Sequence, residues 1–309
     1  MGNIYVVGSS NTDMVVKCKS LPGPGETVLG GEFVQVRGGK GANQAVAAAR
    51  LGGNVSFFCR VGNDAFGLQS LEEYKKEGID ASNIVVDNSG ASGVALIVVD
   101  GKGENYIAVA PGVNANLRPD DVEPLRSLLK PGDVVLMQLE IPMDTVMRAA
   151  QIGDEKGALV ILNPAPAPAK GLPKSICHCL DFILPNRHEA EALVGAKTVP
   201  EVMSQGLLET GITNVIITLG KSGCIWSNKH GVQSLPAYPV KAMDSTAAGD
   251  AFAGGLAVAL TKGWSVPKAI QWAQKAAALS VMRMGAQTSL PTLEEIDNYP
   301  FPDIPEYKE

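Results

Sequence analysis

The sequence predicts a doubly wound α/β fold, in which a mostly parallel sheet is flanked by helices. Two observations lead to this prediction. Short apolar runs alternate along the chain with amphipathic stretches, and glycine-rich or polar motifs follow directly after several of those runs. This alternation is typical of βαβ units, and such folds bind ligands at the carboxyl ends of their strands. A chain of 309 residues can bury enough surface for one large domain, so we expect a single domain over residues 1–309.

The predicted strands are the short apolar runs, which are rich in Val, Ile and Leu. They cover residues 4–7, 55–59, 134–137, 159–162, 182–184 and 215–219. Helices are predicted where apolar residues recur every three or four positions, as Phe252, Leu256 and Leu260 do. These stretches cover residues 42–51, 68–77, 143–156, 188–194, 202–210, 249–262 and 266–282.

Two segments, at about residues 14–37 and 92–110, interrupt this rhythm because they have strand character without intervening helices. Residues 93–99 and 105–109 flank a turn at 100–104 that contains two glycines, which is a hairpin signal. We expect the segments to form a small separate sheet that either covers a ligand or pairs with another subunit. The alternative is an extension of the main sheet at its edge.

Composition narrows the class of protein. The chain is 45% hydrophobic and 19% charged, and its formal net charge of −6 argues against nucleic acid as a partner. Residues 1–7 lack the basic and long apolar regions of a signal peptide, and no apolar run approaches the roughly 20 residues that span a bilayer. Five scattered cysteines suit reduced thiols. We therefore expect a cytoplasmic protein without a membrane partner.

The most informative motif is residues 244–252, where a turn of small residues precedes a predicted helix. Ala247, Ala248 and Gly249 would let an anion approach the unpaired backbone N–H groups at the helix start. Asp250 would lie in the first turn, where it could accept a proton from an attacking hydroxyl. The alternative is an ordinary N-cap aspartate.

A second glycine-rich motif, at residues 38–45, leads into the predicted helix at 42–51. Its glycines permit close approach of a ligand, and Lys40 and Asn43 offer hydrogen-bond donors. The spacing matches neither a Walker loop nor the GxGxxG of dinucleotide-binding proteins. A purely conformational role for the glycines is the alternative.

Polar residues also follow four of the predicted strands. Asn11 and Asp13, and separately Glu140, could bind sugar hydroxyls, or they could simply form turns and strand ends. Asn186 and Glu189 could orient waters around magnesium, or they could form a capping box at a helix start. Residues 218–223 could hold a nucleotide or form a turn between strands.

These motifs resemble those of the ribokinase-like, or PfkB, family of carbohydrate kinases over essentially the whole chain. GGKGANQAVAAARLG at 38–52 resembles the first signature of the family, and DSTAAGDAFAGG at 244–255 resembles the second. VVGSSNTD, MQLE, PN followed by E, ITLGKSG and SGVALIVVDGKGEN are similar to the ribose-phosphorylating branch more than to the adenosine or fructose branches. The resemblance implies transfer of a phosphoryl group from ATP to the 5-hydroxyl of D-ribose.

The resemblance also implies roles for individual residues. Asp250 would be the general base, and Ala247, Ala248, Gly249 and the Asp250 amide would form an anion hole. The residues expected to hold the sugar are Asn11, Thr12, Asp13, Gly39, Lys40, Gly41, Ala42, Asn43, Glu140 and Asp250. Those expected to face ATP are Asn186, Thr218, Leu219, Gly220, Lys221, Ser222, Gly223, Gly249, Asp250 and Gln274.

Two metal ions and a dimer follow from the same resemblance. Mg²⁺ would be linked indirectly to Glu189 through the NxxE pattern. K⁺, as an activator, would bind a site formed by Asp244, Thr246, Ser280, Arg283, Gly285 and Ser289, several of them through backbone carbonyls. The small sheet would be a lid that also pairs two subunits into a homodimer.

Three rival functions remain. The first is a kinase of the same family that acts on deoxyribose, a nucleoside or a hexose. The second is a non-catalytic sugar-binding or regulatory protein, which should have lost the base or the metal pattern, although Asp250, Asn186 and Glu189 are all present. The third is a nicotinamide oxidoreductase, which the missing GxGxxG disfavours.

Overall fold

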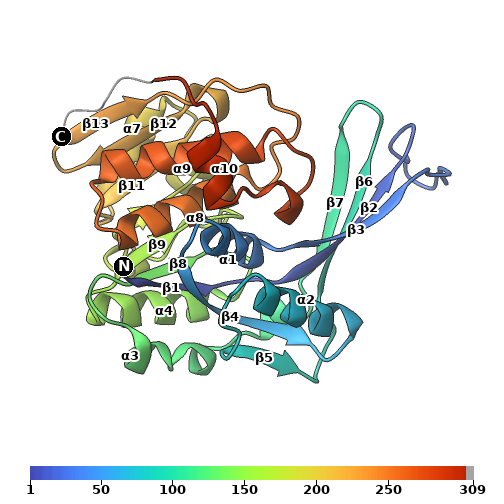
Figure 1. Ribbon diagram of the computed structural model, residues 1–309, viewed down its shortest axis with the longest axis horizontal. Helices are drawn as coiled ribbons and strands as arrows, with labels where there is room; N and C mark the ends of the chain where they lie inside the picture. Colours follow the sequence, from blue (N-terminus) through green and yellow to red (C-terminus); the bar gives the residue numbers. More distant parts are fainter. Residues whose placement is uncertain (304–309) are drawn as a thin grey trace.

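A nine-stranded sheet forms the centre of the computed structural model, which describes residues 1–303 (Figure 1). The strand order is β13-β12-β11-β10-β9-β8-β1-β4-β5. All neighbouring pairs from β11 to β5 are parallel, whereas β12 is antiparallel to both β11 and β13. The strands are β1 Asn3–Val7, β4 Asn54–Gly62, β5 Ile84–Asp87, β8 Val134–Met137, β9 Leu159–Leu162, β10 Phe182–Ile183, β11 Asn214–Thr218, β12 Cys224–Asn228 and β13 Gly231–Leu235.

The strand order reverses at β1, which lies between β4 and β8. The chain first adds β4 and β5 on one side of β1 and then adds β8 to β11 on the other side. In a doubly wound sheet the connections diverge at such a point and leave a crevice at the carboxyl ends of the two strands. Residues that follow β1 and β8 are therefore placed in this crevice.

Helices cover both faces of the sheet, so its central strands are buried on both sides. In β1, Ile4 and Val6 contribute to one apolar cluster, while Tyr5 and Val7 contribute to the other. The helices that pack in the first cluster are α1 Lys40–Arg50, α2 Ala65–Lys76, α8 Ala248–Thr261, α9 Val266–Ser280 and α10 Leu293–Asn298. Those in the second are α3 Leu125–Leu128, α4 Met143–Glu155, α5 Lys174–Cys177, α6 Arg187–Val194 and α7 Pro200–Leu208.

Helices α1 and α8 approach each other closely because α8 carries a glycine at their contact. A Cβ atom on Gly254 would lie 2.8 Å from the Cβ of Ala47 and 3.0 Å from the carbonyl oxygen of Gln44. A larger side chain at position 254 would push the helices apart. The contact brings Asp250, one turn earlier on α8, beside the first turn of α1.

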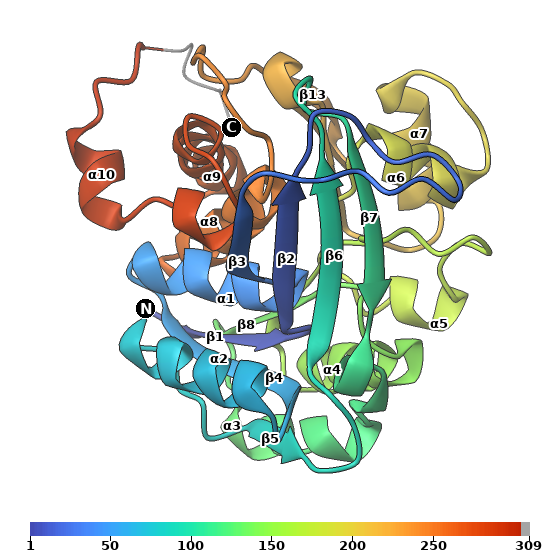
Figure 2. The same ribbon diagram turned by 90° about the vertical axis from the view of Figure 1, so that its right-hand side faces the viewer.

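A second sheet of four strands stands apart from the main sheet (Figures 1 and 2). Its order is β3-β2-β6-β7, with β2 Asn11–Lys17, β3 Phe33–Gly38, β6 Gly93–Val99 and β7 Asn105–Ala110. The alternative that these segments extend the edge of the main sheet is therefore wrong. Every residue of β7 is exposed, and this strand is an edge of the small sheet.

The predicted doubly wound fold is confirmed, and each predicted strand and helix is present with ends that differ by no more than three residues. Strand β2 begins at Asn11, three residues before the predicted segment, so Asn11, Thr12 and Asp13 lie on the small sheet. Strands β5, β12 and β13 were not predicted. In the part of the chain that the structure describes, no helix is long and apolar enough to cross a membrane.

Candidate active site

The carboxylate of Asp250 lies buried between α8 and α1, with only 6% of the residue exposed. Its two oxygens accept hydrogen bonds from Asn43 Nδ2 at 3.0 Å and from Gln44 Nε2 at 2.9 Å. No side chain caps the start of α8. The alternative that Asp250 is a helix cap is therefore wrong, because its hydrogen bonds run across to another helix.

The turn before α8 is strained and leaves backbone donors open. Ala247 has a φ of 59°, in the left-handed region that a residue with a Cβ rarely adopts. The N–H of Ala248 donates to the Ser245 carbonyl, whereas those of Ala247, Gly249 and Asp250 have no partner among residues 1–303. Three of the four predicted anion-hole amides are thus available for a ligand.

The start of α1 is built against the segment that follows β1. Gly39 has a φ of 87°, and a Cβ there would lie 2.7 Å from the backbone nitrogen of Asn11. A Cβ on Gly41 would overlap the backbone of Gly8 and Ser9. These two glycines are therefore required for the turn, which places Lys40 at the rim and buries Ala42 beneath it.

Glu140 follows β8 and binds both motifs of this crevice. Its carboxylate accepts hydrogen bonds from Ser9 Oγ at 2.5 Å and from the Lys40 backbone N–H at 3.0 Å. Asn11 Oδ1 accepts a hydrogen bond from Asn114 Nδ2 at 2.8 Å. Glu140 after β8, Ser9 after β1 and the glycine-rich turn after β3 are thus one assembly.

Several charges converge on this crevice. Burial, followed by the charges of Glu140 and Asp250, raises the pKa of Asp13 to about 6. Burial also raises the pKa of Asp250, against the opposing effects of Lys40 and the two amide donors. Burial alone would lower the pKa of Lys40, but Asp250, Glu140 and Glu189 outweigh it and raise that pKa. A hydroxylated, uncharged ligand suits such a set of acceptors around one cation.

A cavity of about 450 Å³ opens on the other side of the α8 start. Its walls are mostly apolar, as a site for a flat heterocycle requires. It is lined by Thr218, Gly220, Lys221, Gly223, Cys224, Ala237, Tyr238, Pro239, Val240, Ala242, Ser245, Ala248, Gly249, Phe252, Gln274, Ala277, Ala278 and Val281. Leu219 and Ser222 belong to the same turn but do not line the cavity.

The segment at 218–223 is both a turn and a cavity wall, so its two interpretations are compatible. It connects the antiparallel strands β11 and β12 through a short 3₁₀ helix, Gly220–Ser222. Gly223 has a φ of 87°, and a Cβ there would overlap the Leu235 carbonyl. On the opposite wall, Gln274 donates through Nε2 to that carbonyl at 3.2 Å, and its Oε1 has no partner.

Asn186 and Glu189 form a capping box at the start of α6. The Asn186 side chain accepts from the Glu189 N–H at 2.9 Å, and Glu189 Oε2 accepts from the Asn186 N–H at 2.8 Å. This interpretation of the pair is confirmed. Burial raises the pKa of Glu189, partly opposed by the Asn186 N–H and by Lys40, so its carboxylate also faces the charged crevice.

Asp244 ties two loops together beside α8. Its Oδ1 accepts from the Thr246 N–H and hydroxyl, and its Oδ2 accepts from the Gly285 N–H at 2.8 Å. Burial would raise the pKa of Asp244, but these hydrogen bonds lower it overall. The side chains of the other predicted K⁺ residues bond elsewhere: Ser280 to Ala277, Ser289 to Ala286 and Arg283 to Glu295.

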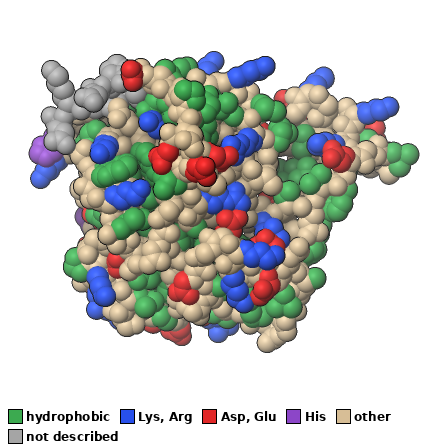
Figure 3. Space-filling model, viewed as in Figure 1, with side chains coloured by type: hydrophobic (Ala, Val, Ile, Leu, Met, Phe, Trp, Pro, Cys, Tyr) green, Lys and Arg blue, Asp and Glu red, His purple; other side chains and the backbone are tan. Residues whose placement is uncertain are grey.

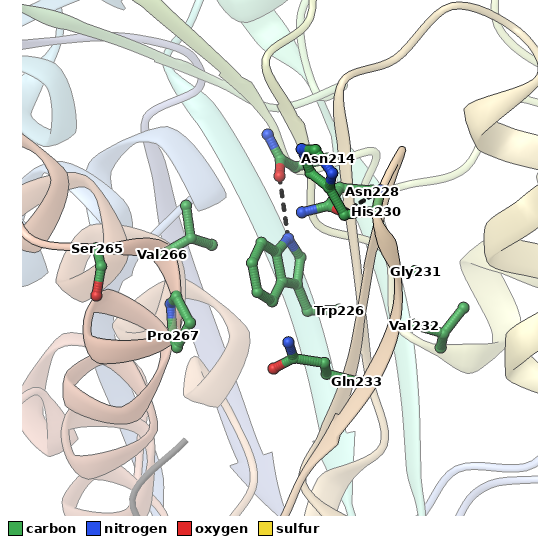
Figure 4. Close-up of a pocket in the computed structure, with 10 residues that line it drawn as sticks. All are labelled: Asn214, Trp226, Asn228, His230, Gly231, Val232, Gln233, Ser265, Val266 and Pro267. Carbon is green, nitrogen blue, oxygen red and sulfur yellow. Dashed lines mark hydrogen bonds between the residues drawn. The ribbon is translucent and has the colours of Figure 1, made fainter. Parts of the chain in front are cut away.

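A further cavity, of about 510 Å³, lies between β12, β13 and the start of α9 (Figure 4). Within it the indole Nε1 of Trp226 donates to Asn214 Oδ1 at 3.0 Å. None of its lining residues belongs to the motifs described above. We therefore assign the candidate active site to the crevice around Asp250 and the cavity lined by Ala248 and Gly249, which lie on either side of the start of α8.

Comparison with known proteins agrees with this arrangement. A model of the pfkB family of carbohydrate kinases matches residues 1–293. The chain belongs to the PfkB family of carbohydrate kinases. Among curated members, the ribokinase of Haemophilus influenzae is 40% identical over 296 residues, which cover 94% of this chain and 96% of the relative. The deoxyribokinase of Salmonella typhimurium is 35% identical over 301 residues, which cover 96% and 98%.

Solved structures of PfkB kinases have the same fold. The ribokinase of Thermotoga maritima superposes with a TM-score of 0.88 at 39% identity, over 96% of this chain and 98% of that chain. The ribokinase of Arabidopsis thaliana, complexed with ribose and ATP, gives a TM-score of 0.87 at 29% identity, with the same two coverages. The ribokinase-like α/β fold predicted from the sequence is confirmed.

Some residues of this PfkB site were not predicted. Ser9 bonds Glu140, Asn114 bonds Asn11, and Gln44 bonds Asp250. Gln44 directly follows the predicted Asn43 in the glycine-rich motif, so the motif could have been used to predict it as a site residue. Asn114 lies more than a hundred residues from its partner Asn11, and no local sequence pattern predicts such a contact.

We expect Asp13→Asn to stabilise the free protein above pH 6. The folded state raises the pKa of Asp13 from 3.8 to about 6, so it binds more protons than the unfolded chain between these values. Stability therefore falls as the pH rises through that interval, and the substitution removes the loss. The gain in the free energy of unfolding should approach about 3 kcal/mol above pH 6 and shrink towards pH 4. Thermal denaturation at pH 8 and pH 5 measures it.

Asp87→Asn is the matched control, because Ser89 and then Arg60 hold the pKa of Asp87 well below its usual range despite burial. This substitution should destabilise the protein at pH 8. An equal gain for Asp13→Asn at both pH values would contradict the burial of its charge near Glu140 and Asp250.

Proposed function

We propose that this protein transfers the γ-phosphoryl group of ATP to the 5-hydroxyl of D-ribose, which gives ribose 5-phosphate and ADP. The observation that carries the proposal is the junction at the start of α8, where Asp250 lies in the acidic crevice while Ala248 and Gly249, directly before it, line the apolar cavity. A base at that junction is adjacent to both a sugar and a nucleotide. The relatives and solved structures that are ribokinases support the choice of ribose.

The crevice would hold the sugar. Carboxylates accept hydrogen bonds from hydroxyl groups, and amides both donate and accept, so neighbouring hydroxyls can be bound in pairs. Asn43 Oδ1 is buried without a partner, which makes it a free acceptor beside the base. We assign the sugar to Asn11, Thr12, Asp13, Gly39, Lys40, Gly41, Ala42, Asn43 and Glu140, with Asp250 on the 5-hydroxyl.

Asp250 would act as general base while the turn before it holds the transferring group. Phosphoryl transfer requires positioning and charge stabilisation more than covalent help from the protein. The open amides of Ala247, Gly249 and Asp250 and the positive end of the 14-residue helix α8 supply that stabilisation. Asp250 would take the hydroxyl proton as the oxygen attacks.

The residues near Glu189 fit a magnesium ion carried by the nucleotide. Among residues 1–303, no cluster of three or more acidic, histidine or cysteine side chains could hold a metal alone. Mg²⁺ prefers phosphate oxygens and water with few protein ligands, and Glu189 and Asn186 would orient such waters. When bound, the ion neutralises charge on the phosphate oxygens.

The loops joined by Asp244 fit a potassium ion bound mainly by carbonyl groups. The N–H groups of Met243 and Asp244 donate to the Val281 carbonyl, so residues 243–246 lie against residues 281–285. We propose that K⁺ binds between these loops, with Asp244, Thr246, Ser280, Arg283, Gly285 and Ser289 as its surroundings. The ion would rigidify the turn that carries the open amides.

The second sheet would act as a lid and as a dimer interface. Paired residues of neighbouring strands point to the same face, so Ile107, Ile97 and Val15 share the face of Asp13. Hydrophobic side chains gather on this sheet where it borders the hollow beside the main body (Figure 3). A second copy of the chain could cover this face, and we propose a cytoplasmic homodimer.

The sugar preference is tested by an ADP-release assay with ATP and Mg²⁺. We expect the highest kcat/KM with ribose, ahead of deoxyribose, fructose and adenosine. Turnover should fall on chelation of Mg²⁺ and rise when K⁺ replaces choline. Faster phosphorylation of deoxyribose, fructose or adenosine would overturn the choice of ribose. If K⁺ does not change turnover, the proposed potassium site is wrong, while the choice of ribose is unaffected.

Asp250→Ala should lower turnover by on the order of 100-fold or more, because the 5-hydroxyl loses its base. Sugar binding should change little, since the other crevice residues remain. Calorimetric titration with ribose and steady-state kinetics separate the two quantities. Near-normal turnover of the variant would exclude Asp250 as the base.

Ile107→Asp should convert the dimer to a monomer, because it places a charge in the apolar face of the lid. Sedimentation velocity measures the change. Leu96→Asp is a matched control on the opposite face, with an exposed fraction of 55% against 56% for Ile107. A monomeric parent protein, or equal dissociation by both variants, would contradict the proposed interface.

A further inference from the structure

The base Asp250 is held by a chain of amide side chains that extends away from the crevice. Gln44 Nε2 donates to Asp250 Oδ1 at 2.9 Å and to Asn163 Oδ1 at 3.1 Å. Gln138 Nε2 donates to Gln44 Oε1 at 2.6 Å, and Asn163 Nδ2 donates to the Leu184 carbonyl at 2.8 Å. Gln44 and Gln138 are fully buried, and Asn163 is 8% exposed.

The three outer members come from adjacent parallel strands. Gln138 follows β8, Asn163 follows β9 and Leu184 follows β10. The strand ends are fixed by the sheet, so they present one donor, Gln138 Nε2, and one acceptor, Asn163 Oδ1, to Gln44 at constant positions. Among the four hydrogen-bonded residues Gln44, Gln138, Asn163 and Leu184, Gln44 on α1 is the one that contacts Asp250.

The hydrogen bonds determine which way the Gln44 amide points. The Leu184 carbonyl accepts only, so Asn163 turns its Nδ2 towards it and its Oδ1 towards Gln44. Gln138 offers a donor to the other side of the Gln44 amide. A flipped Gln44 would place oxygen against both Asn163 Oδ1 and the Asp250 carboxylate, and nitrogen against the Gln138 donor. The observed orientation is therefore the one that aims an N–H at the base.

We propose that Gln44, oriented by Gln138 and Asn163, is a positioning residue that fixes the Asp250 carboxylate for attack by the sugar hydroxyl. Its neighbour Asn43 has a different part. Asn43 also donates to Asp250, but its Oδ1 is unpartnered and available to the sugar, whereas both ends of the Gln44 amide are bound within the protein. The inference rests on the proposed role of Asp250 as base. It holds for any sugar whose hydroxyl group the enzyme phosphorylates.

The Gln44 bond also affects the proton equilibrium of the base. Lys40 on α1 is the cation that favours the carboxylate, while Glu140 after β8 opposes it. Asp13 on β2 and Glu189 on α6 are further acids that interact with Asp250. A hydrogen bond from Gln44 favours the charged form, so its loss should raise the pKa of Asp250.

The test is Gln44→Met, which keeps the volume of the side chain and removes both polar ends. We expect kcat to fall roughly 10-fold or more, with little change in the KM for the sugar, since the charge-assisted bond acts on the base. The acidic limb of the kcat/KM profile should move to higher pH. The fastest sugar in the panel above is the substrate, and binding of ribose and ATP is measured by calorimetry.

A second readout does not require turnover. In protein labelled with ¹³C at aspartate carboxyl carbons, the Asp250 signal is identified by its absence in Asp250→Asn. It should titrate at higher pH in Gln44→Met. This readout keeps the inference separate from the sugar assignment, because a failure of ribose turnover in the parent protein leaves the titration comparison valid.

Thr145→Val is the control for loss of a buried hydrogen bond elsewhere. Thr145 Oγ1 donates to the Leu117 carbonyl, and the residue is fully buried on α4. The Thr145→Val substitution should lower the melting temperature without shifting the pH profile of kcat/KM or the titration of Asp250. A Gln44→Met protein with unchanged kcat and an unchanged Asp250 titration would overturn the inference. So would a fall in activity that Thr145→Val reproduces at equal loss of stability.

Discussion

The burial of the Asp250 carboxylate is the constraint on which the rest of this site depends. A charge without solvent costs several kcal/mol unless donors or opposite charges replace water. Here Lys40, Asn43 and Gln44 supply the replacement, and all three lie within the first five residues of α1. Helices α1 and α8 must therefore keep one separation, and Gly254 allows it by removing the side chain that would hold them apart.

The sheet topology explains why the glycine-rich turn meets the other sugar-side residues. Because β1 lies between β4 and β8, the residues that follow β1 and β8 enter the same crevice. Ser9 and Glu140 meet there, and the Glu140 carboxylate then holds the backbone of Lys40. One acid thus joins two strand ends to a helix start.

The sequence allowed six of the nine strands of the main sheet, the long helices and both signature turns to be predicted, because each depends on local periodicity or on glycine. It left Asn186 and Glu189 open between two roles, since residues three apart at a helix start suit both a capping box and a metal-linked pair. The amide chain through Gln138 and Asn163 could not be predicted. Its members are 94 and 119 residues from Gln44 and meet only because β8 and β9 are neighbours in the sheet.

Asp244 and Asp250 show how one turn gives the same residue type two different chemistries. Asp244 accepts from Thr246 and Gly285, and the pKa of this half-buried carboxyl is lowered, so it stays an anion that fastens loops. Asp250 is more deeply buried, and its pKa is raised, which brings it nearer to the range in which a carboxylate can take a proton. The left-handed Ala247 between them turns the chain into α8. This left-handed residue thus lies between the carboxylate that fastens two loops and the carboxylate that we propose as the base, which are six positions apart.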